Sequence, residues 1–176
     1  MKILICYHSQ TGNTEKVARI IAEALAEEDL AVMPAADVDP ATLGDYEMVL
    51  LGSGVYAGAI GASIKPLVKQ ATTLPAQVAL FLTHANSNPA MWRDAFKVVR
   101  KFIEKAGSAV VAEFDCYGEN LTTTVEQRQR LYANLTPEQR ELAEAHEEDI
   151  RGRPNEEDLD SARAFARALV NPAAIF

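Results

Sequence analysis

A short segment near the start of the chain has the residue types that bind a small anion. Its six positions hold three hydroxyl residues, two carboxamides and one glycine: Ser9, Gln10, Thr11, Gly12, Asn13 and Thr14. Hydroxyls and carboxamides donate hydrogen bonds, and a glycine lets the backbone close around a ligand. A phosphate monoester has the size and the charge that such a segment can hold.

The elements on either side of this segment would aim its donors at one point. An apolar run over residues 2–7 predicts a buried strand before it, and helical periodicity over residues 15–27 predicts a helix after it. The first N–H groups of a helix have no partner inside the helix, and the helix dipole favours negative charge there. An ordinary helix cap requires one such residue, whereas this segment has five. We therefore predict a phosphate-binding loop.

Other phosphate-binding motifs are absent from this loop. It has neither the lysine of a nucleoside triphosphate loop nor the Gly-x-Gly-x-x-Gly pattern of a dinucleotide site. Cys6 precedes the loop, as the thiol of a phosphatase would, but no arginine follows it to clamp a phosphoryl group during transfer. The loop is therefore predicted to hold a phosphate and not to react with it.

The composition excludes several function classes. With 176 residues, 48% of them hydrophobic, the chain is expected to form one domain over residues 1–176 with a sizeable core. A net charge of −8 makes nucleic acid a poor partner. The same charge suits a partner protein with a basic surface, or it serves only to keep the protein in solution. Two separate cysteines and three scattered histidines predict no metal site.

Nothing in the sequence predicts export or membrane insertion. The apolar start is too short for a signal peptide and has no cleavage site, and no apolar stretch has the length of a transmembrane helix. We therefore expect a cytoplasmic protein, with Cys6 and Cys116 reduced and packed in apolar strands.

Strand and helix patterns alternate along the chain. After the first pair, apolar runs predict four more strands, over residues 30–35, 47–52, 77–83 and 109–116. Further helices are predicted over residues 62–71, 89–106 and 158–170. This alternation requires parallel strands joined by right-handed crossovers, and therefore an α/β fold in which a doubly wound sheet has helices on both faces.

Ligands of such sheets bind beyond the carboxyl ends of the strands. The predicted phosphate loop lies at that edge, and three further polar loops begin there. Their candidate binding residues are Ser53, Gly54, Val55, Tyr56, Ala57, Gly58, Thr83, His84, Ala85, Asn86, Tyr117 and Gly118. We expect the four loops to form one site.

The segment over about residues 119–155 is longer than an ordinary crossover to a last helix. Residues 124–132 have helical character, and Thr136, Pro137 and Gln139 are typical of the start of a second helix that ends near residue 150. Residues 138–160 hold ten carboxylates and three arginines. This acidic helical insertion would serve as a lid, as a docking surface, or as a solvated segment with no role.

Three motifs resemble those of the flavodoxin family. Residues 9–14 are similar to the family's FMN-phosphate loop, residues 51–56 to its second flavin loop, and residues 153–159 to the acidic start of its last helix. The resemblance covers nearly the whole chain except about residues 119–150. It implies a flavodoxin-like fold, which is a five-stranded parallel sheet with strand order 2-1-3-4-5, here with a helical insertion after the fifth strand.

The resemblance also implies noncovalently bound FMN and low-potential, one-electron transfer between redox proteins. The first loop would hold the phosphate, Tyr56 would stack on or border the flavin ring, and Gly58 would offer a backbone group to the ring nitrogen that takes up a proton. Flavodoxins often carry a second stacking aromatic after the fourth strand. Here His84 or Asn86 would take that place, or Tyr117 from the next loop, or nothing stacks.

Lys16 is expected near the phosphate, and the negative net charge is expected to keep the second reduction step at low potential. A second hypothesis is an enzyme, because FMN-dependent quinone reductases and protoporphyrinogen dehydrogenases resemble flavodoxins and carry extra segments beside the flavin. A third is a cofactor-free binding module. A receiver domain is disfavoured, since it needs acidic residues where this chain has His8, Ser9 and Ser53.

Overall fold

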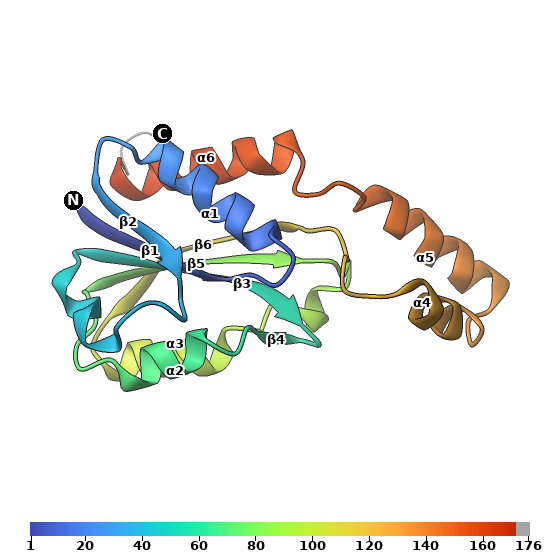
Figure 1. Ribbon diagram of the computed structural model, residues 1–176, viewed down its shortest axis with the longest axis horizontal. Coiled ribbons are helices and arrows are strands. Elements are labelled where there is room, and N and C mark those ends of the chain that lie inside the picture. Colours follow the sequence, from blue (N-terminus) through green and yellow to red (C-terminus); the bar gives the residue numbers. More distant parts are fainter. Residues whose placement is uncertain (172–176) are drawn as a thin grey trace.

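The computed structural model describes residues 1–171 and has three layers (Figure 1). Helices α1 (Asn13–Ala24) and α6 (Glu156–Val170) cover one face of a central sheet. Helices α2 (Ile64–Gln70) and α3 (Lys97–Lys105) cover the other face. The predicted doubly wound α/β architecture is therefore confirmed, while residues 172–176 of the predicted domain lie outside the described residues.

The sheet has the predicted strand order. Its strands are β1 (Lys2–His8), β2 (Asp29–Pro34), β3 (Met48–Tyr56), β4 (Ala59–Ile60), β5 (Gln77–His84) and β6 (Ala109–Tyr117). Five of them are parallel in the order β2-β1-β3-β5-β6, so β5 and β6 are the predicted fourth and fifth strands. The sequence pattern did not predict the two-residue strand β4, which pairs antiparallel with the end of β3.

Apolar side chains fill both faces of the sheet. Because successive side chains of a strand point to opposite faces, Ile3 and Ile5 pack in the core under α1 and α6, whereas Leu4 and Cys6 pack in the core over α2 and α3. Their complete burial explains why β1 appears in the sequence as a continuous apolar run.

One predicted helix was wrong over its first half. Residues 89–106 were expected to be a single helix, but residues Pro89–Met91 form a short 3-10 turn and α3 begins only at Lys97. Trp92 leaves helical geometry with φ −140°, and its ring stacks on His84 at a centroid distance of 4.1 Å. This tertiary contact replaces the local helical preference. Phe96, Val99 and Ile103 occupy the core as the periodicity predicted.

The other helix boundaries differ by a few residues. The predicted ranges 15–27, 62–71 and 158–170 correspond to 13–24, 64–70 and 156–170. Gly107 ends α3 with φ +79°, as expected for a glycine after a helix. A 3-10 turn, η1 (Pro40–Asp45), occupies part of the loop after β2.

The insertion after β6 is helical, as predicted. Helices α4 (Val125–Tyr132) and α5 (Pro137–Asp149) extend as an arm from the carboxyl edge of the sheet (Figure 1). Thr124 and Thr136 each begin a helix with a capping box. Arg128 pairs with Glu147 between the two helices. No helix within residues 1–171 combines the length and the apolar character needed to cross a membrane.

Candidate functional site

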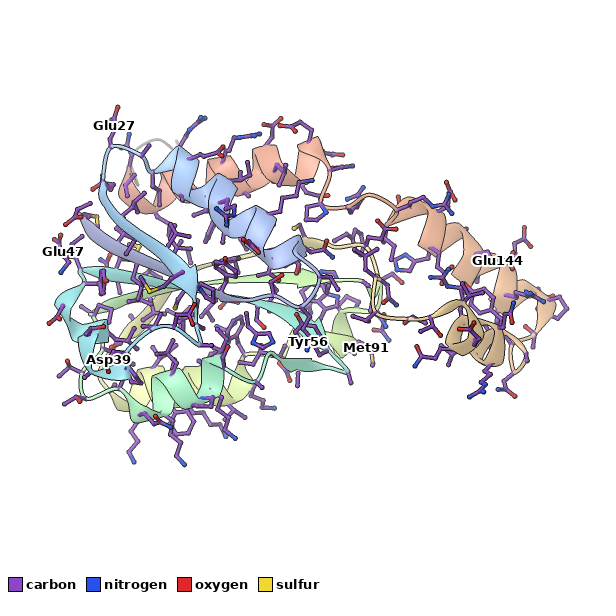
Figure 2. All side chains as sticks on the ribbon, in the orientation of Figure 1. Glu27, Asp39, Glu47, Tyr56, Met91 and Glu144 are labelled. Atoms are coloured by element: carbon purple, nitrogen blue, oxygen red, sulfur yellow. The ribbon has the colours of Figure 1, made fainter. Side chains whose placement is uncertain are left out.

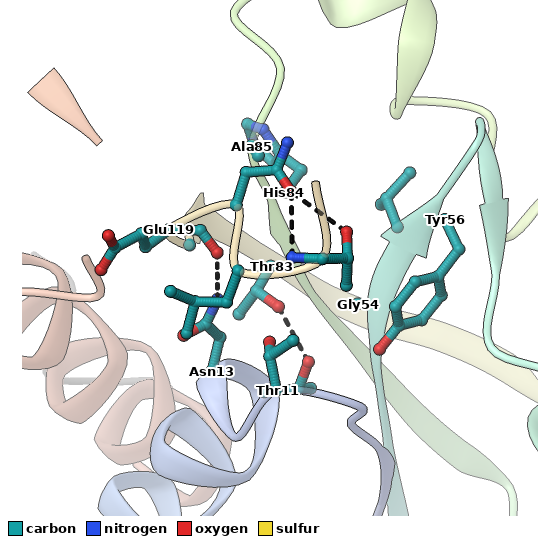
Figure 3. Close-up of a pocket in the computed structure, with 14 residues that line it drawn as sticks. Thr11, Asn13, Gly54, Tyr56, Thr83, His84, Ala85 and Glu119 are labelled. Carbon is teal, nitrogen blue, oxygen red and sulfur yellow. Dashed lines mark hydrogen bonds between the residues drawn. The ribbon is translucent and has the colours of Figure 1, made fainter. Parts of the chain in front are cut away.

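Two adjoining hollows lie at the carboxyl edge of the sheet. The first, the phosphate-loop hollow, is lined by Thr11, Asn13, Thr14, Gly54, Val55, Tyr56, Thr83, His84, Ala85 and Gly118 to Thr122 (Figure 3). The second, the Met91 hollow, is lined by Gln10, Val55 to Gly58, His84 to Asn86, Met91, Asn120, Thr122 and Thr123. Since six residues line both, the hollows form one groove. All four predicted loops contribute to it.

The first loop ends in a helix start that no side chain caps. Gly12 occupies the N-cap position of α1 with φ +91°, a conformation that glycine adopts readily. Nothing lies within 4 Å of the position that a Cβ would take there, so the space beside Gly12 is open. The first backbone N–H groups of α1 are therefore presented beside Thr11, Asn13 and Thr14, which line the hollow.

The loop uses two of its own N–H groups to hold its shape. The amide of Gly12 donates to Ser9 Oγ at 3.1 Å, and the amide of Gln10 donates to the hydroxyl of Tyr56 at 3.0 Å. The hydroxyl of Ser9 therefore stabilises the conformation of the loop itself. Lys16, which was expected near the phosphate, donates instead to the carbonyl of Pro154 at 2.7 Å. The donors of this loop that line the hollow are consequently all neutral.

The loop after β6 covers one side of the first loop. Asn13 Nδ2 donates to the carbonyl of Glu119 at 2.9 Å (Figure 3). A Cβ on Gly118 would lie 2.8 Å from that same Nδ2, so glycine permits the close approach. Thr14 and Thr83 share a buried hydrogen bond of 2.8 Å between their hydroxyls, which ties α1 to the end of β5.

The second loop surrounds the groove on its β3 side. Ser53 is fully buried, where its hydroxyl accepts from the amide of Gly61 and donates to the carbonyl of Gly54. Its observed contacts thus brace the loop, and Ser53 lines neither hollow. Tyr56 lies at the groove with its ring edge-on to His8 at 5.6 Å. Burial raises the pKa of Tyr56, so its hydroxyl stays protonated.

The second loop also has an unusual backbone at its turn. Ala57 and Gly58 have φ values of +50° and +81°, and both line the Met91 hollow. Figure 2 shows Tyr56 and Met91 on this side of the molecule, with Glu144 farther out on the arm. The turn therefore brings two residues with positive φ to the Met91 hollow.

The third and fourth loops meet through aromatic rings. His84 is 6% exposed and stacks on Trp92 at an interplanar angle of 11°. Tyr117 meets His84 edge-on at 5.1 Å and lines neither hollow. His146 of the arm lies 2.7 Å from the carbonyl of Ala85, which connects α5 to the site.

Several lining residues escaped the sequence prediction. They are Met91, Leu121, Thr122 and Thr123, together with Glu119 and Asn120, which belong to the fourth predicted loop but were not among its candidate binding residues. Met91 was assigned to a helix face, so its omission from the predicted site followed from the wrong helix boundary. Residues 119–123 were treated as part of the insertion. The polar run Glu119 to Asn120 after a strand end was the available signal, since ligands bind at strand ends.

Comparison with known proteins agrees with this geometry. The family profile described as "Flavodoxin domain" matches residues 4–167. The chain belongs to this flavodoxin domain family. The probable flavodoxin 1 of Bacillus subtilis is 28% identical over 175 residues, which cover 96% of this chain and 90% of that protein.

Solved structures show the same fold. Oxidised flavodoxin 1 from Bacillus cereus has a TM-score of 0.68 at 17% identity, and the match covers 97% of this chain and 98% of that chain. A flavoprotein from Lactobacillus acidophilus, solved in complex with FMN, has a TM-score of 0.50 at 23% identity and covers 65% of this chain and 92% of that chain. The flavodoxin fold predicted from the sequence is thereby confirmed.

Proposed function

We propose that this flavodoxin family member binds FMN noncovalently in the groove and transfers electrons one at a time between redox proteins in the cytoplasm. The phosphate of FMN would lie at the start of α1, and the flavin ring would lie between the loops after β3 and β5. FMN supplies the redox chemistry, and the chain supplies orientation and the local electric field.

The uncapped start of α1 is the observation that carries this proposal. A helix N-terminus with free N–H groups favours an anion, and Gly12 with φ +91° leaves the adjacent space open. The side chains of Thr11 and Asn13 line the same hollow. Such neutral donors fit a group that is held through many turnovers and is never transferred.

The rest of the groove suits a flat ring. Val55 and Tyr56 line both hollows on one side, and His84 and Ala85 line both on the other. Aromatic and apolar side chains provide the faces that a conjugated ring requires. The net charge of −8 and the exposed acids of the arm favour redox partners with basic docking surfaces.

Titration of the purified apoprotein with FMN and with riboflavin tests the proposal. We expect one FMN per chain and much weaker binding of riboflavin, because riboflavin lacks the phosphate. Stepwise photoreduction should then show two separate one-electron stages in the visible spectrum. Equal affinity for both flavins, or no binding, would refute the phosphate assignment. Unaided oxidation of NAD(P)H with a quinone would favour an enzyme over a carrier.

A further inference from the structure

His84 has both ring nitrogens directed at acceptor oxygens. Its Nδ1 lies 3.0 Å from the carbonyl oxygen of Asn86, and its Nε2 lies 3.3 Å from Oδ2 of Asp115 (Figure 3 shows His84 at the groove). The side chain is almost fully buried and lines both hollows of the proposed flavin site. These two oxygens could accept both N–H groups of a protonated ring.

A carbonyl and an ionised carboxylate only accept hydrogen bonds. A neutral imidazole has one N–H, so one of its two nitrogens would direct a lone pair at an oxygen. The imidazolium form has two N–H groups and satisfies both contacts without rearrangement. The ring of Trp92, stacked on His84 with centroids 4.1 Å apart, provides an aromatic face that attracts a cation.

Other charged groups around His84 come from β6, from α5, from the segment before α6 and from the residue after Trp92. On β6, Asp115 makes the direct contact, and its side chain is 46% exposed. On α5, His146 lies against the carbonyl of Ala85 and edge-on to Tyr117 at 5.7 Å. Arg153, before α6, lies over the Tyr117 ring at 5.4 Å but pairs with Asp158. Arg93 and Asp115 both line a separate hollow beside Trp92.

We propose that His84 takes up a proton when the bound cofactor gains negative charge, and that it holds the resulting imidazolium between Asn86 and Asp115. This inference rests on the proposed flavin function. The electron would come from the reducing partner and the proton on His84 from water, so the net charge of the site would stay the same. His84 is thus a charge-compensating residue. Proton binding by His84 would raise the electron affinity of the cofactor, and reduction of the cofactor would raise the proton affinity of His84 by the same factor.

Histidine-selective ¹⁵N NMR on the holoprotein tests the proposal in the oxidised and fully reduced forms. We expect the titration midpoint of His84 to rise by at least one pH unit on reduction, which is a tenfold gain in proton affinity. By linkage, the second reduction step then moves by about 59 mV per pH unit between the two midpoints. A His84 midpoint that is unchanged by reduction would overturn the proposal.

Two variants separate His84 from its neighbours. His84→Gln should remove the contribution of this residue to the pH dependence of the second step, whereas His146→Gln should retain it. Asp115→Asn should lower the His84 midpoint in both redox forms, because the carboxylate stabilises the cation. The wild-type NMR titration remains decisive if a variant fails to fold. Failure to bind FMN would refute the proposed function, and with it the proton uptake that depends on it. An unchanged His84 midpoint in a protein that does bind FMN would refute the proton uptake alone.

Discussion

Replacement of Thr11 by alanine gives a direct measure of what the first loop binds. Thr11 lies at the start of α1 and lines the phosphate-loop hollow, and within residues 1–171 its hydroxyl makes no hydrogen bond. Its removal therefore breaks no contact of the free protein. A hydrogen bond from such a hydroxyl to a charged phosphate contributes about 1.5–3 kcal/mol.

This range sets the expected change in affinity. Since every 1.4 kcal/mol is a factor of ten, the dissociation constant for FMN should rise about 10- to 150-fold in Thr11→Ala. Riboflavin has no phosphate, so its dissociation constant should stay within about twofold of the wild-type value by the same arithmetic. Isothermal titration calorimetry of the apoprotein with each flavin measures both constants.

Thr72→Ala is the matched control, because Thr72 is an exposed threonine after α2, remote from both hollows. It should bind both flavins as the wild type does, and urea unfolding should show that both variants fold normally. If Thr11→Ala weakens FMN and riboflavin equally, the hydroxyl acts on the ring or the fold. If it weakens neither, the phosphate lies elsewhere, and the assignment of the loop fails.

Three further predictions address stability and the electric field. Phe96→Ala, which removes a fully buried core ring, should lower the free energy of unfolding in urea by about 3–5 kcal/mol, whereas Val98→Ala on the exposed side of α3 should change it by less than about 0.5 kcal/mol. Burial lowers the pKa of His8, so the folded state binds this proton less readily than the unfolded chain, and the free energy of unfolding should fall as pH drops below about 6.5. His8→Gln should flatten that fall in urea titrations at several pH values, and an unchanged slope would contradict it. The second reduction step should move to higher potential as salt screens the net charge of −8, and insensitivity to ionic strength in spectroelectrochemistry would remove the electrostatic account.

The sheet was predictable because its parallel strands are covered on both faces. Burial on both faces makes each central strand a continuous apolar run, as in Ile3 to Cys6, and such runs are visible without any tertiary information. The arrangement of helices around the sheet then follows from the handedness of the crossovers. The first loop was predictable for a similar reason, since its donors are neighbours in the sequence and in space.

The structure added what the sequence could not show where distant residues determine local structure. Trp92 departs from a helical pattern because it stacks on His84, and no local propensity encodes that contact. Lys16 was expected near the phosphate, but its ammonium group reaches the carbonyl of Pro154, which is 138 residues away in the chain. Ser53 remains a predicted site residue, and in the structure its hydroxyl contacts the backbone of Gly54 and Gly61. Sequence patterns identify which loops meet, but they do not show which donors remain free.

Two electrostatic influences act on the site over different distances: the net charge of the chain and the contact between His84 and Asp115. The net charge of −8 acts over distances that mobile ions screen at physiological salt. The contact between the buried His84 ring and Asp115 acts over 3.3 Å, which is shorter than the distance over which mobile ions screen a charge. Ionic strength should therefore shift the second reduction step similarly in the wild type and in His84→Gln, whereas pH should shift it differently in the two proteins. If salt and pH effects both vanished together in His84→Gln, the two influences would not be separate, and a single local charge would account for the potential.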